Sequence, residues 1–226
     1  MVCHAFRVFV AAIAAIFMAT SSAFTADQKV DFRSLTVFTS PNLVAPSVAP
    51  KTIMVEYGKS LPPIGYVQFC ARGQDECKAG GVKAKRIALS NKDWNQINQV
   101  NQFVNTSIKP TSDIDLYHVA EYWAYPTTAG DCEDYVLLKK RLLTKLGFAP
   151  SDLLITVLLD EHGEGHAVLT ILTQNMDLIL DNRRNEVLSA NQTAYKFLKR
   201  QSQTDPKIWI SLKKTETQVL VSSQAN

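Results

Sequence analysis

Three residues in the second half of the sequence could together break or transfer an acyl bond. Cys132 lies in Gly130-Asp131-Cys132-Glu133-Asp134, where a helical pattern begins, and the positive end of a helix dipole favours thiolate over thiol. His166 begins an apolar strand-like run, and Asp181 ends the next such run. The chain therefore offers, in order, a nucleophile, a base and a residue that orients the base.

The spacing of His166 and Asp181 predicts that the two side chains meet. A turn candidate, Gln174-Asn175, separates the two runs, so we expect a hairpin whose open end holds both residues side by side. The carboxylate can then bind one imidazole nitrogen and leave the other facing Cys132. A metal site formed by His162 and His166 is a competing prediction, but the glycines between them favour a loop over the helix it needs.

The acidic residues beside the cysteine need an explanation. Asp131, Glu133 and Asp134 oppose a thiolate, because like charge disfavours ionisation. Either these side chains point away from the sulfur, or a cation neutralises them. The alternative is that Cys132 is a small core residue and that the acids only cap a helix.

The first residues have the layout of a secretory signal. Arg7 is the only lysine or arginine in residues 1–23, an apolar run covers Val8 to Met18, and small residues follow as Ser21-Ser22-Ala23. The run is too short for a transmembrane helix. We expect cleavage after Ala23, no membrane span in the mature chain, and a periplasmic or secreted protein; an uncleaved N-terminal anchor is the alternative.

The mature chain is long enough for one good core. We expect residues 24–60 to be loosely structured, because they are rich in proline, and residues 61–226 to form one domain. The formal net charge of the whole chain is +3 and is spread without a long basic run. A nucleic-acid partner is therefore not expected, since it needs a clustered basic face.

Cysteine usage fits an exported protein. Cys3 leaves with the signal, so Cys70, Cys77 and Cys132 remain. Cys70 and Cys77 enclose a polar loop and could form a disulfide in an oxidising compartment. Zinc binding by this pair is the alternative, although no second ligand pair with zinc spacing follows.

The order of periodic segments predicts an α+β domain. Ser90 to Ile108 is a predicted helix with Ser90 as its N-cap and an amide-rich face that is either solvated or binds substrate. A second predicted helix, Cys132 to Leu146, carries cations in its C-terminal half, which suits its dipole. The remaining predicted elements are strands at Leu153–Leu159, His166–Thr173 and Met176–Leu180, a helix at Asn191–Arg200, and edge strands at Lys207–Leu212 and Gln218–Val221.

Four segments of the chain resemble the bacterial transglutaminase-like cysteine peptidases: Tyr122-Trp123-Ala124-Tyr125-Pro126, Gly130-Asp131-Cys132-Glu133-Asp134-Tyr135, Gly165-His166-Ala167-Val168-Leu169 and Asp177-Leu178-Ile179-Leu180-Asp181-Asn182. The Cys70–Cys77 loop and Trp209 also resemble that family, so the resemblance covers roughly Ile64 to Leu212. It implies a papain/transglutaminase-like fold with the nucleophile helix packed on an antiparallel sheet.

The resemblance also implies an activity and its participants. Cys132 would attack a peptide carbonyl, His166 would carry the proton and Asp181 would orient His166. Relatives are periplasmic endopeptidases that cleave large surface adhesins near a pair of alanines and so release biofilms. They depend on Ca²⁺, which points here to Asp131, Glu133 and Asp134 as ligands, and an inner-membrane receptor that senses cyclic di-GMP sequesters them.

Two other functions stay open from the sequence. The same triad could transfer the acyl group to an amine, as transglutaminases do, since only the acceptor differs. The chain could also be a non-catalytic binding domain that keeps the fold and a buried cysteine. Labelled-amine incorporation separates the first alternative from hydrolysis, and ordinary reactivity of Cys132 would favour the second.

Overall fold

The computed structural model describes residues 44–46, 52–79 and 85–214. The predicted signal at residues 1–23 and the predicted strand at Gln218–Val221 lie outside the described residues. In the part of the chain that the structure describes, no helix is both long enough and apolar enough to cross a bilayer.

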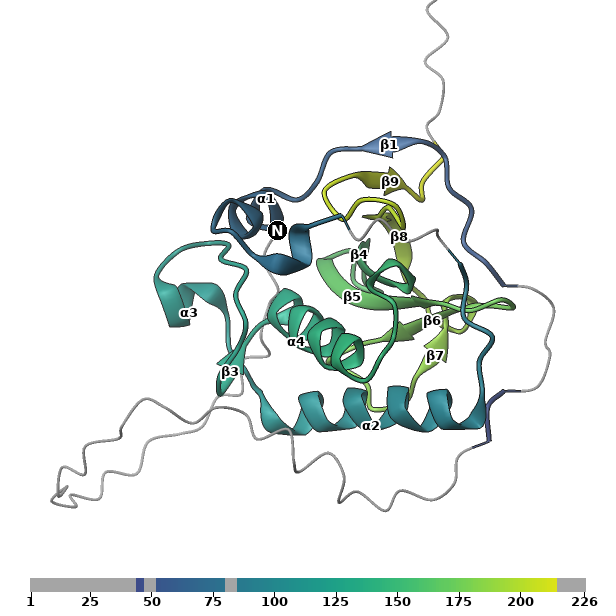
Figure 1. The fold of residues 1–226 in the computed structure, drawn as a ribbon. Coiled ribbons are helices and arrows are strands. Elements are labelled where there is room, and N and C mark those ends of the chain that lie inside the picture. Colours follow the sequence, from purple (N-terminus) through teal and green to yellow (C-terminus); the bar gives the residue numbers. More distant parts are fainter. Residues whose placement is uncertain (1–43, 47–51, 80–84, 215–226) are drawn as a thin grey trace, which may run out of the picture.

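The scaffold of the described domain is a seven-stranded sheet in which each neighbouring pair is antiparallel (Figure 1). In order across the sheet, its strands are β1 (Lys59–Ser60), β9 (Trp209–Ser211), β8 (Lys196–Gln201), β4 (Leu153–Leu159), β5 (Gly165–Leu172), β6 (Asp177–Leu180) and β7 (Leu188–Ser189). The three strands predicted between residues 153 and 180 are thus confirmed to within one residue at each end.

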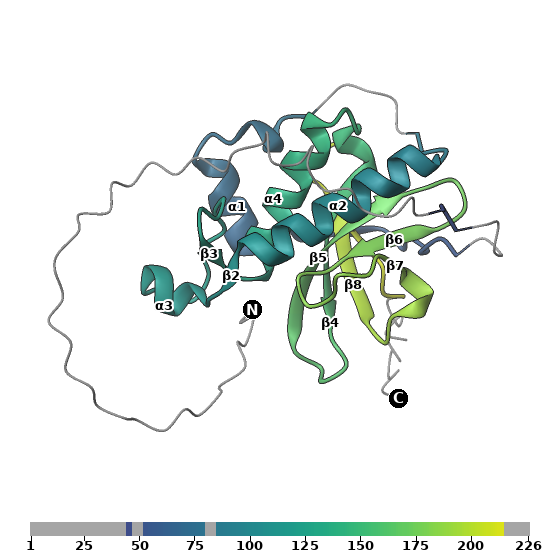
Figure 2. The same cartoon turned by 90° about the horizontal axis from the view of Figure 1, so that it is seen from below.

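Two long helices lie on the same side of this sheet (Figure 2). Helix α4 (Cys132–Lys145) packs against β4 and β5, and helix α2 (Asn91–Ser107) packs against α4. The predicted arrangement of a nucleophile helix on an antiparallel sheet is therefore confirmed. The shorter elements are α1 (Ile64–Ala71), α3 (Asp113–Tyr117), a parallel pair β2 (Lys109–Pro110) and β3 (Ala129–Gly130), and 3₁₀ turns at Asp75–Cys77, Pro150–Asp152 and Ala190–Gln192.

Helix α2 begins where its sequence predicts. The side chain of Ser90 accepts a hydrogen bond from the Asp93 backbone N–H, and the Asp93 carboxylate accepts one from the Ser90 backbone N–H. This reciprocal cap satisfies backbone donors that the first helical turn leaves open.

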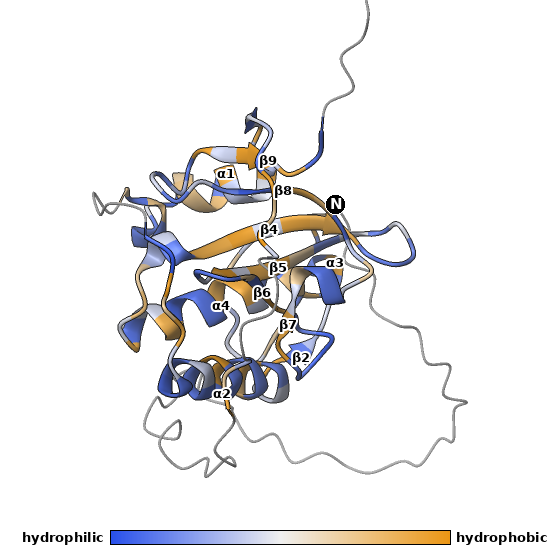
Figure 3. Ribbon diagram, turned by 90° about the vertical axis from the view of Figure 1, so that its right-hand side faces the viewer, coloured by the Kyte–Doolittle hydropathy of each residue, from blue (hydrophilic) through white to orange (hydrophobic). Residues whose placement is uncertain are grey.

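The central strands are buried on both faces, and Figure 3 shows β4 and β5 as largely apolar ribbons. Side chains that alternate along a strand point to opposite faces. Leu169 and Ile171 face α4 and join the main core, whereas Val168 packs with Ile179 and Tyr195 in a smaller cluster on the other face. The second cluster therefore includes Tyr195, a residue that also contacts the candidate active site.

The predicted helix at Asn191–Arg200 is wrong. The second half of this segment, residues 196–200, belongs to β8, which pairs with β4 on one side and β9 on the other. Backbone pairing with two neighbouring strands outweighs the weak local helix preference, which is a common outcome for short ambiguous segments. The segment Lys207–Leu212 contains β9 as predicted, but β9 is not an edge strand because β1 lies beyond it.

The loosely structured segment predicted at residues 24–60 is partly ordered. Thr52 bridges to Met176, and β1 pairs with β9. Lys59–Ser60 therefore belong to the sheet, and Thr52 is joined to Met176 by a single bridge. Backbone hydrogen bonds to the sheet, which leave no trace in composition, account for the difference.

The predicted disulfide between Cys70 and Cys77 is present. It joins the end of α1 to the 3₁₀ turn at Asp75–Cys77, and Cys77 is buried in the main core. The zinc alternative for this pair is excluded by that bond.

Two of the cations in the second half of α4 are buried. Lys140 Nζ donates to the carbonyl of Leu153 and, at 3.0 Å, to Gln201 Oε1. Lys139 is fully buried, and its Nζ has no hydrogen-bond partner among the described residues. Burial lowers the pKa of each lysine to about 7. The helix dipole alone therefore does not explain why lysines occupy these two buried positions.

Replacing Lys139 with Met should weaken the dependence of stability on pH between about 7 and 10. In that window the unfolded chain still binds the lysine protons, whose pKa there is about 10.4, while the folded chain has lost them. The two lysines therefore make the free energy of unfolding rise with pH, and each makes a similar contribution. Urea unfolding across this window measures it. Lys145→Met, at an exposed position of the same helix, should keep the full slope, and an unchanged slope in Lys139→Met would contradict the assignment.

Candidate active site

Cys132 is the first residue of α4, and its sulfur lies against the start of β5. The parallel pairing of β2 with β3 holds the chain just before the helix. The backbone N–H of Ala167 donates to Cys132 Sγ at 3.3 Å. For a reduced Cys132, a donor aimed at the sulfur favours the thiolate, as does the helix N-terminus. The sulfur therefore lies beside the residue that follows His166.

The predicted histidine and aspartate form a buried pair. His166 Nε2 lies 2.9 Å from Asp181 Oδ1, and both side chains are almost fully buried. Strands β5 and β6 form an antiparallel hairpin in which Leu169 pairs with Leu180. This register brings His166 and Asp181 together at the open end of the hairpin. The other ring nitrogen, Nδ1 of His166, has no hydrogen-bond partner among the described residues. Of the two ring nitrogens, Nδ1 is therefore the one that is chemically able to exchange a proton.

Asp181 is held as an anion. Burial alone would raise its pKa, but the hydrogen bond and charge of His166, the backbone N–H of Arg183 and the hydroxyl of Tyr195 together hold the pKa of Asp181 well below its usual range. A carboxylate that stays ionised can fix the orientation and tautomer of the imidazole.

Amide side chains of α2 hold the turn that follows Asp181. Asn105 Nδ2 donates to the carbonyls of Asp181 at 2.9 Å and Arg184 at 2.8 Å. Asn101, fully buried, donates to the carbonyls of Arg184 and Asn185, each at 3.0 Å. At these two positions the amide-rich face of α2 is neither simply solvated nor a substrate surface. Its side chains hold the loop that carries Asp181 through hydrogen bonds to backbone carbonyls.

The turn between β4 and β5 is tied to the same loop. Arg183 Nη1 donates to Asp160 Oδ2 at 2.6 Å, while Asp160 Oδ1 accepts the backbone N–H groups of His162 and Glu164. Burial would raise the pKa of Asp160, but the contact with Arg183 and the two backbone donors hold it at about 2. The start of β5, and so His166, is anchored from both sides.

Three carboxylates gather near the N-terminus of α4, which carries Cys132. Ligand atoms of Asp113, Asp131 and Asp134 all lie within 4.8 Å of one another. Each of these side chains has one buried oxygen with no hydrogen-bond partner among the described residues: Asp113 Oδ1, Asp131 Oδ1 and Asp134 Oδ2. Of the predicted ligands, Asp131 and Asp134 are in this group. The group also contains Asp113, which the sequence analysis missed.

Glu133 contacts both the cysteine and this group, since its carboxyl is hydrogen-bonded to that of Asp131. Its Oε2 is 3.3 Å from Cys132 Sγ, and it is not among the three grouped carboxylates. Burial, followed by the charge of Asp131, raises the pKa of Glu133 well above its usual value. A raised pKa weakens the tendency of Glu133 to carry negative charge beside the sulfur, and negative charge there would oppose a thiolate.

The grouped carboxylates resist ionisation as they stand. Burial and the charge of Asp113 raise the pKa of Asp131 to about 7. Burial raises the pKa of Asp134 to about 8, with a further contribution from the charge of Asp131, and burial also raises the pKa of Asp113. Carboxylate oxygens that are buried without a hydrogen-bond partner are costly, and they are also the ligands that a bound cation such as Ca²⁺ prefers.

The same acids hold a neighbouring loop against α4. Asp134 Oδ1 accepts the backbone N–H of Ala124 at 2.8 Å, and Asp113 accepts that of Tyr122. Gly130 permits this approach, because a Cβ there would lie 2.6 Å from Asp134 Oδ2. The glycine of the nucleophile motif therefore has a packing role.

The competing metal site at His162 and His166 is not supported. Nε2 of His166 is bound to Asp181, and His162 lies in the turn whose backbone Asp160 binds. Within the described residues, the group of side chains that could hold a metal contains neither histidine.

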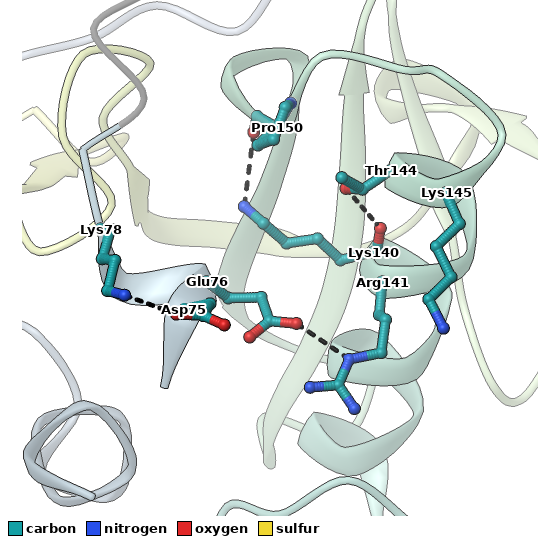
Figure 4. A pocket seen from close by; sticks show the side chains of 8 residues that line it. All are labelled: Asp75, Glu76, Lys78, Lys140, Arg141, Thr144, Lys145 and Pro150. Carbon is teal, nitrogen blue, oxygen red and sulfur yellow. Dashed lines mark hydrogen bonds and ion pairs between the residues drawn. The ribbon is translucent and has the colours of Figure 1, made fainter. Parts of the chain in front are cut away.

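A pocket of about 420 Å³ lies on the other half of α4, away from the triad (Figure 4). Its charged groups are engaged with one another or with carbonyls: Arg141 with Glu76, Lys78 with Asp75, and Lys140 with Pro150. The residues that line it are Asp75, Glu76, Lys78, Lys140, Arg141, Thr144, Lys145 and Pro150. None of the candidate catalytic residues is among them.

Residues 56–217 match the family described as bacterial transglutaminase-like cysteine proteinases. The chain belongs to this family. It is a cysteine peptidase by that membership, and its mixed helix and antiparallel-sheet architecture is the one the family name implies. No match is found among the curated proteins.

Solved structures of LapG from Legionella pneumophila are similar to this chain. The calcium-bound form is 22% identical, with a TM-score of 0.45, over 56% of this chain and 73% of that one. A second LapG structure is 23% identical, with a TM-score of 0.43, over 52% and 68% of the two chains. The EGTA-treated form is 24% identical, with a TM-score of 0.41, over 47% and 62%. At these TM-scores, membership rests on the family match alone.

Replacing Asn101 with Ala should lower the free energy of unfolding by about 1 kcal/mol or more, because the Asn185 carbonyl would lose its donor and the Arg184 carbonyl one of its two. Gln102→Ala, at an exposed position on the same helix, should change it by no more than about 0.5 kcal/mol. Urea unfolding of both variants measures the difference. Equal stabilities would show that the loop after Asp181 does not depend on the amide clamp.

Proposed function

We propose that this cysteine peptidase is an endopeptidase that uses Cys132, His166 and Asp181 as its catalytic triad. The observation that carries the proposal is the pairing of His166 Nε2 with Asp181 beside a sulfur that accepts the N–H of Ala167. Asp181 keeps the imidazole in one orientation and tautomer, and Nδ1 of His166 is left for proton exchange with Cys132.

In the first half of the reaction, His166 takes the proton of Cys132, and the thiolate attacks the carbonyl carbon of the scissile peptide bond. The oxygen of the tetrahedral intermediate becomes negative, and the backbone N–H of Cys132 at the helix N-terminus is suited to stabilise it. His166 then gives its proton to the leaving amine, and the C–N bond breaks. The product that remains is a thioester on Cys132.

In the second half, His166 removes a proton from a water molecule that attacks the thioester. The collapse of the second tetrahedral intermediate releases a carboxylic acid, and the sulfur leaves as the thiolate beside the imidazolium. Asp181 stays ionised throughout, because its hydrogen bonds stabilise the carboxylate. Hydrolysis therefore consumes one water and returns the site to its starting charge.

We further propose that Asp113, Asp131 and Asp134 bind Ca²⁺. The donor set fits, since Ca²⁺ prefers carboxylate oxygens and each of these residues has a buried oxygen that lacks a partner. Such an ion would supply positive charge to the acidic cluster. Glu133, a predicted ligand, lies against Cys132 Sγ, so its share in binding stays a prediction. These side chains also hold the loop at Tyr122 and Ala124, which links cation binding to the shape of the site.

The substrate and the cellular setting follow from the family resemblance. We propose that the substrate is a large surface adhesin cut near a pair of alanines, that the enzyme acts in the periplasm or outside the cell after removal of residues 1–23, and that this cleavage releases biofilm. An inner-membrane receptor that senses cyclic di-GMP is the proposed regulator.

Replacing Cys132 with Ala, or His166 with Ala, should lower kcat/KM by about 10³-fold or more, because triad members act as a unit. His162→Ala is the matched control and should retain activity, since its side chain lies outside the triad. The assay follows cleavage of an adhesin fragment that contains an Ala-Ala pair by mass spectrometry, with a labelled amine present. Cleavage by the Cys132 variant would refute the peptidase site, and amine incorporation exceeding hydrolysis would favour acyl transfer.

Replacing Asp113 with Asn should weaken Ca²⁺ binding by about 10-fold or more, because it removes one charged ligand of three. Asp115→Asn is a matched control in the same short helix, where Asp115 accepts a hydrogen bond from Ser112. Isothermal titration calorimetry with CaCl₂ measures both variants. Equal affinities for Asp113→Asn and the natural chain, or no calcium binding by the natural chain, would contradict the site.

A further inference from the structure

The two oxygens of Asp181 are held by different partners. Oδ1 accepts from His166 Nε2 and from the backbone N–H of Arg183, each at 2.9 Å. Oδ2 accepts from the hydroxyl of Tyr195 at 2.5 Å. The terminal torsion of an aspartate is soft, so a carboxylate held at one oxygen can still turn. With both oxygens held, the plane of the group and its angle to the imidazole are fixed.

Tyr195 is itself fixed by its surroundings. It lies between the 3₁₀ turn at Ala190–Gln192 and strand β8, and only 9% of it is exposed. Its ring packs at a steep angle to the His166 ring, with centroids 6.2 Å apart, and to the Phe197 ring at 6.5 Å. The tyrosine therefore touches both members of the pair, one through its ring and the other through its hydroxyl.

The hydroxyl of Tyr195 remains a donor across the working pH range of a protein. Burial, and then the negative charge of Asp181, raises the pKa of Tyr195 to about 12. A protonated phenol facing an ionised carboxylate can only donate, so the direction of this hydrogen bond is settled.

We propose that Tyr195 is a positioning residue of the peptidase site, which acts on His166 through the second oxygen of Asp181. Its hydroxyl keeps the Asp181 carboxylate turned so that Oδ1 accepts from His166 Nε2, and this keeps Nδ1 directed to the proton of Cys132. Tyr195 contacts no reacting atom in this scheme. The proposal rests on the proposed triad, because positioning has a kinetic effect only if His166 moves protons.

The contrasting role for Tyr195 is packing alone, in the small cluster with Val168 and Ile179. The two roles differ in what the hydroxyl does. If Tyr195 only fills space, a phenylalanine serves as well for catalysis, whereas a positioning residue loses its function with the single oxygen.

The test compares Tyr195→Phe with Tyr66→Phe. Tyr66 is also buried, and its hydroxyl accepts from Gln201 Nε2 at 2.7 Å, but it contacts no triad residue in the described structure. Steady-state kinetics on the adhesin fragment should give a kcat about 10-fold lower for Tyr195→Phe with KM unchanged, because a hydrogen bond to a charged group is lost outside the substrate's contacts. Tyr66→Phe should keep kcat within about 2-fold of the natural chain.

Proton NMR supplies a readout that does not depend on the substrate. The Nε2 proton of His166, shared with Asp181, should give a downfield resonance that shifts or broadens in Tyr195→Phe and stays in place in Tyr66→Phe. If the natural chain cleaves nothing, the proposed function fails while this resonance still tests the positioning. If Tyr195→Phe does not fold, 3-fluorotyrosine at position 195 keeps the ring and strengthens the donor, and it should move the same resonance. An unmoved resonance, or equal kcat values for the two phenylalanine variants, would overturn the proposal.

Discussion

The site depends on a hydrogen bond between an imidazole and a carboxylate in the interior of the domain. His166 Nε2 and Asp181 Oδ1 lie 2.9 Å apart, with both side chains almost completely buried. An isolated ionised carboxylate is costly to bury, so its stability here requires all its donors at once: the imidazole, the Arg183 backbone and the Tyr195 hydroxyl. Tyr195 from the second face of the sheet therefore meets this carboxylate, while the asparagines of α2 hold the backbone carbonyls of the loop that carries it.

Two structural systems meet at the nucleophile. The sheet fixes His166 and Asp181 through the register of β5 with β6, whereas α4 and the pairing of β2 with β3 fix Cys132. The hydrogen bond from Ala167 to the sulfur joins them. Ligand atoms of Asp131 and Asp134 lie close to Asp113, which holds the loop at Tyr122. A cation bound there would therefore act on both the charge and the geometry near Cys132.

The sequence predicts the parts of this arrangement that depend on local pattern. The spacing of His166 and Asp181 across a short turn is sufficient to place them together, because an antiparallel hairpin fixes its own register. The role of Tyr195 is hidden, since the run from Asn191 to Arg200 predicts a helix but forms β8. Asp113 and Asn101 meet their partners only through tertiary packing. The spacing of Asp113 and Asn101 in the sequence does not indicate these partners, although the repeated asparagines show that α2 has a polar face.

The central claim is that His166 and Cys132 form a thiolate–imidazolium pair. The most direct measurement is the rate of alkylation of Cys132 by iodoacetamide as a function of pH, on the chain without residues 1–23. The arrangement predicts a plateau of reactivity well below pH 8.5, the pKa of an ordinary thiol, and its loss in His166→Ala. A single ionisation near pH 8.5, the same in both proteins, would contradict it.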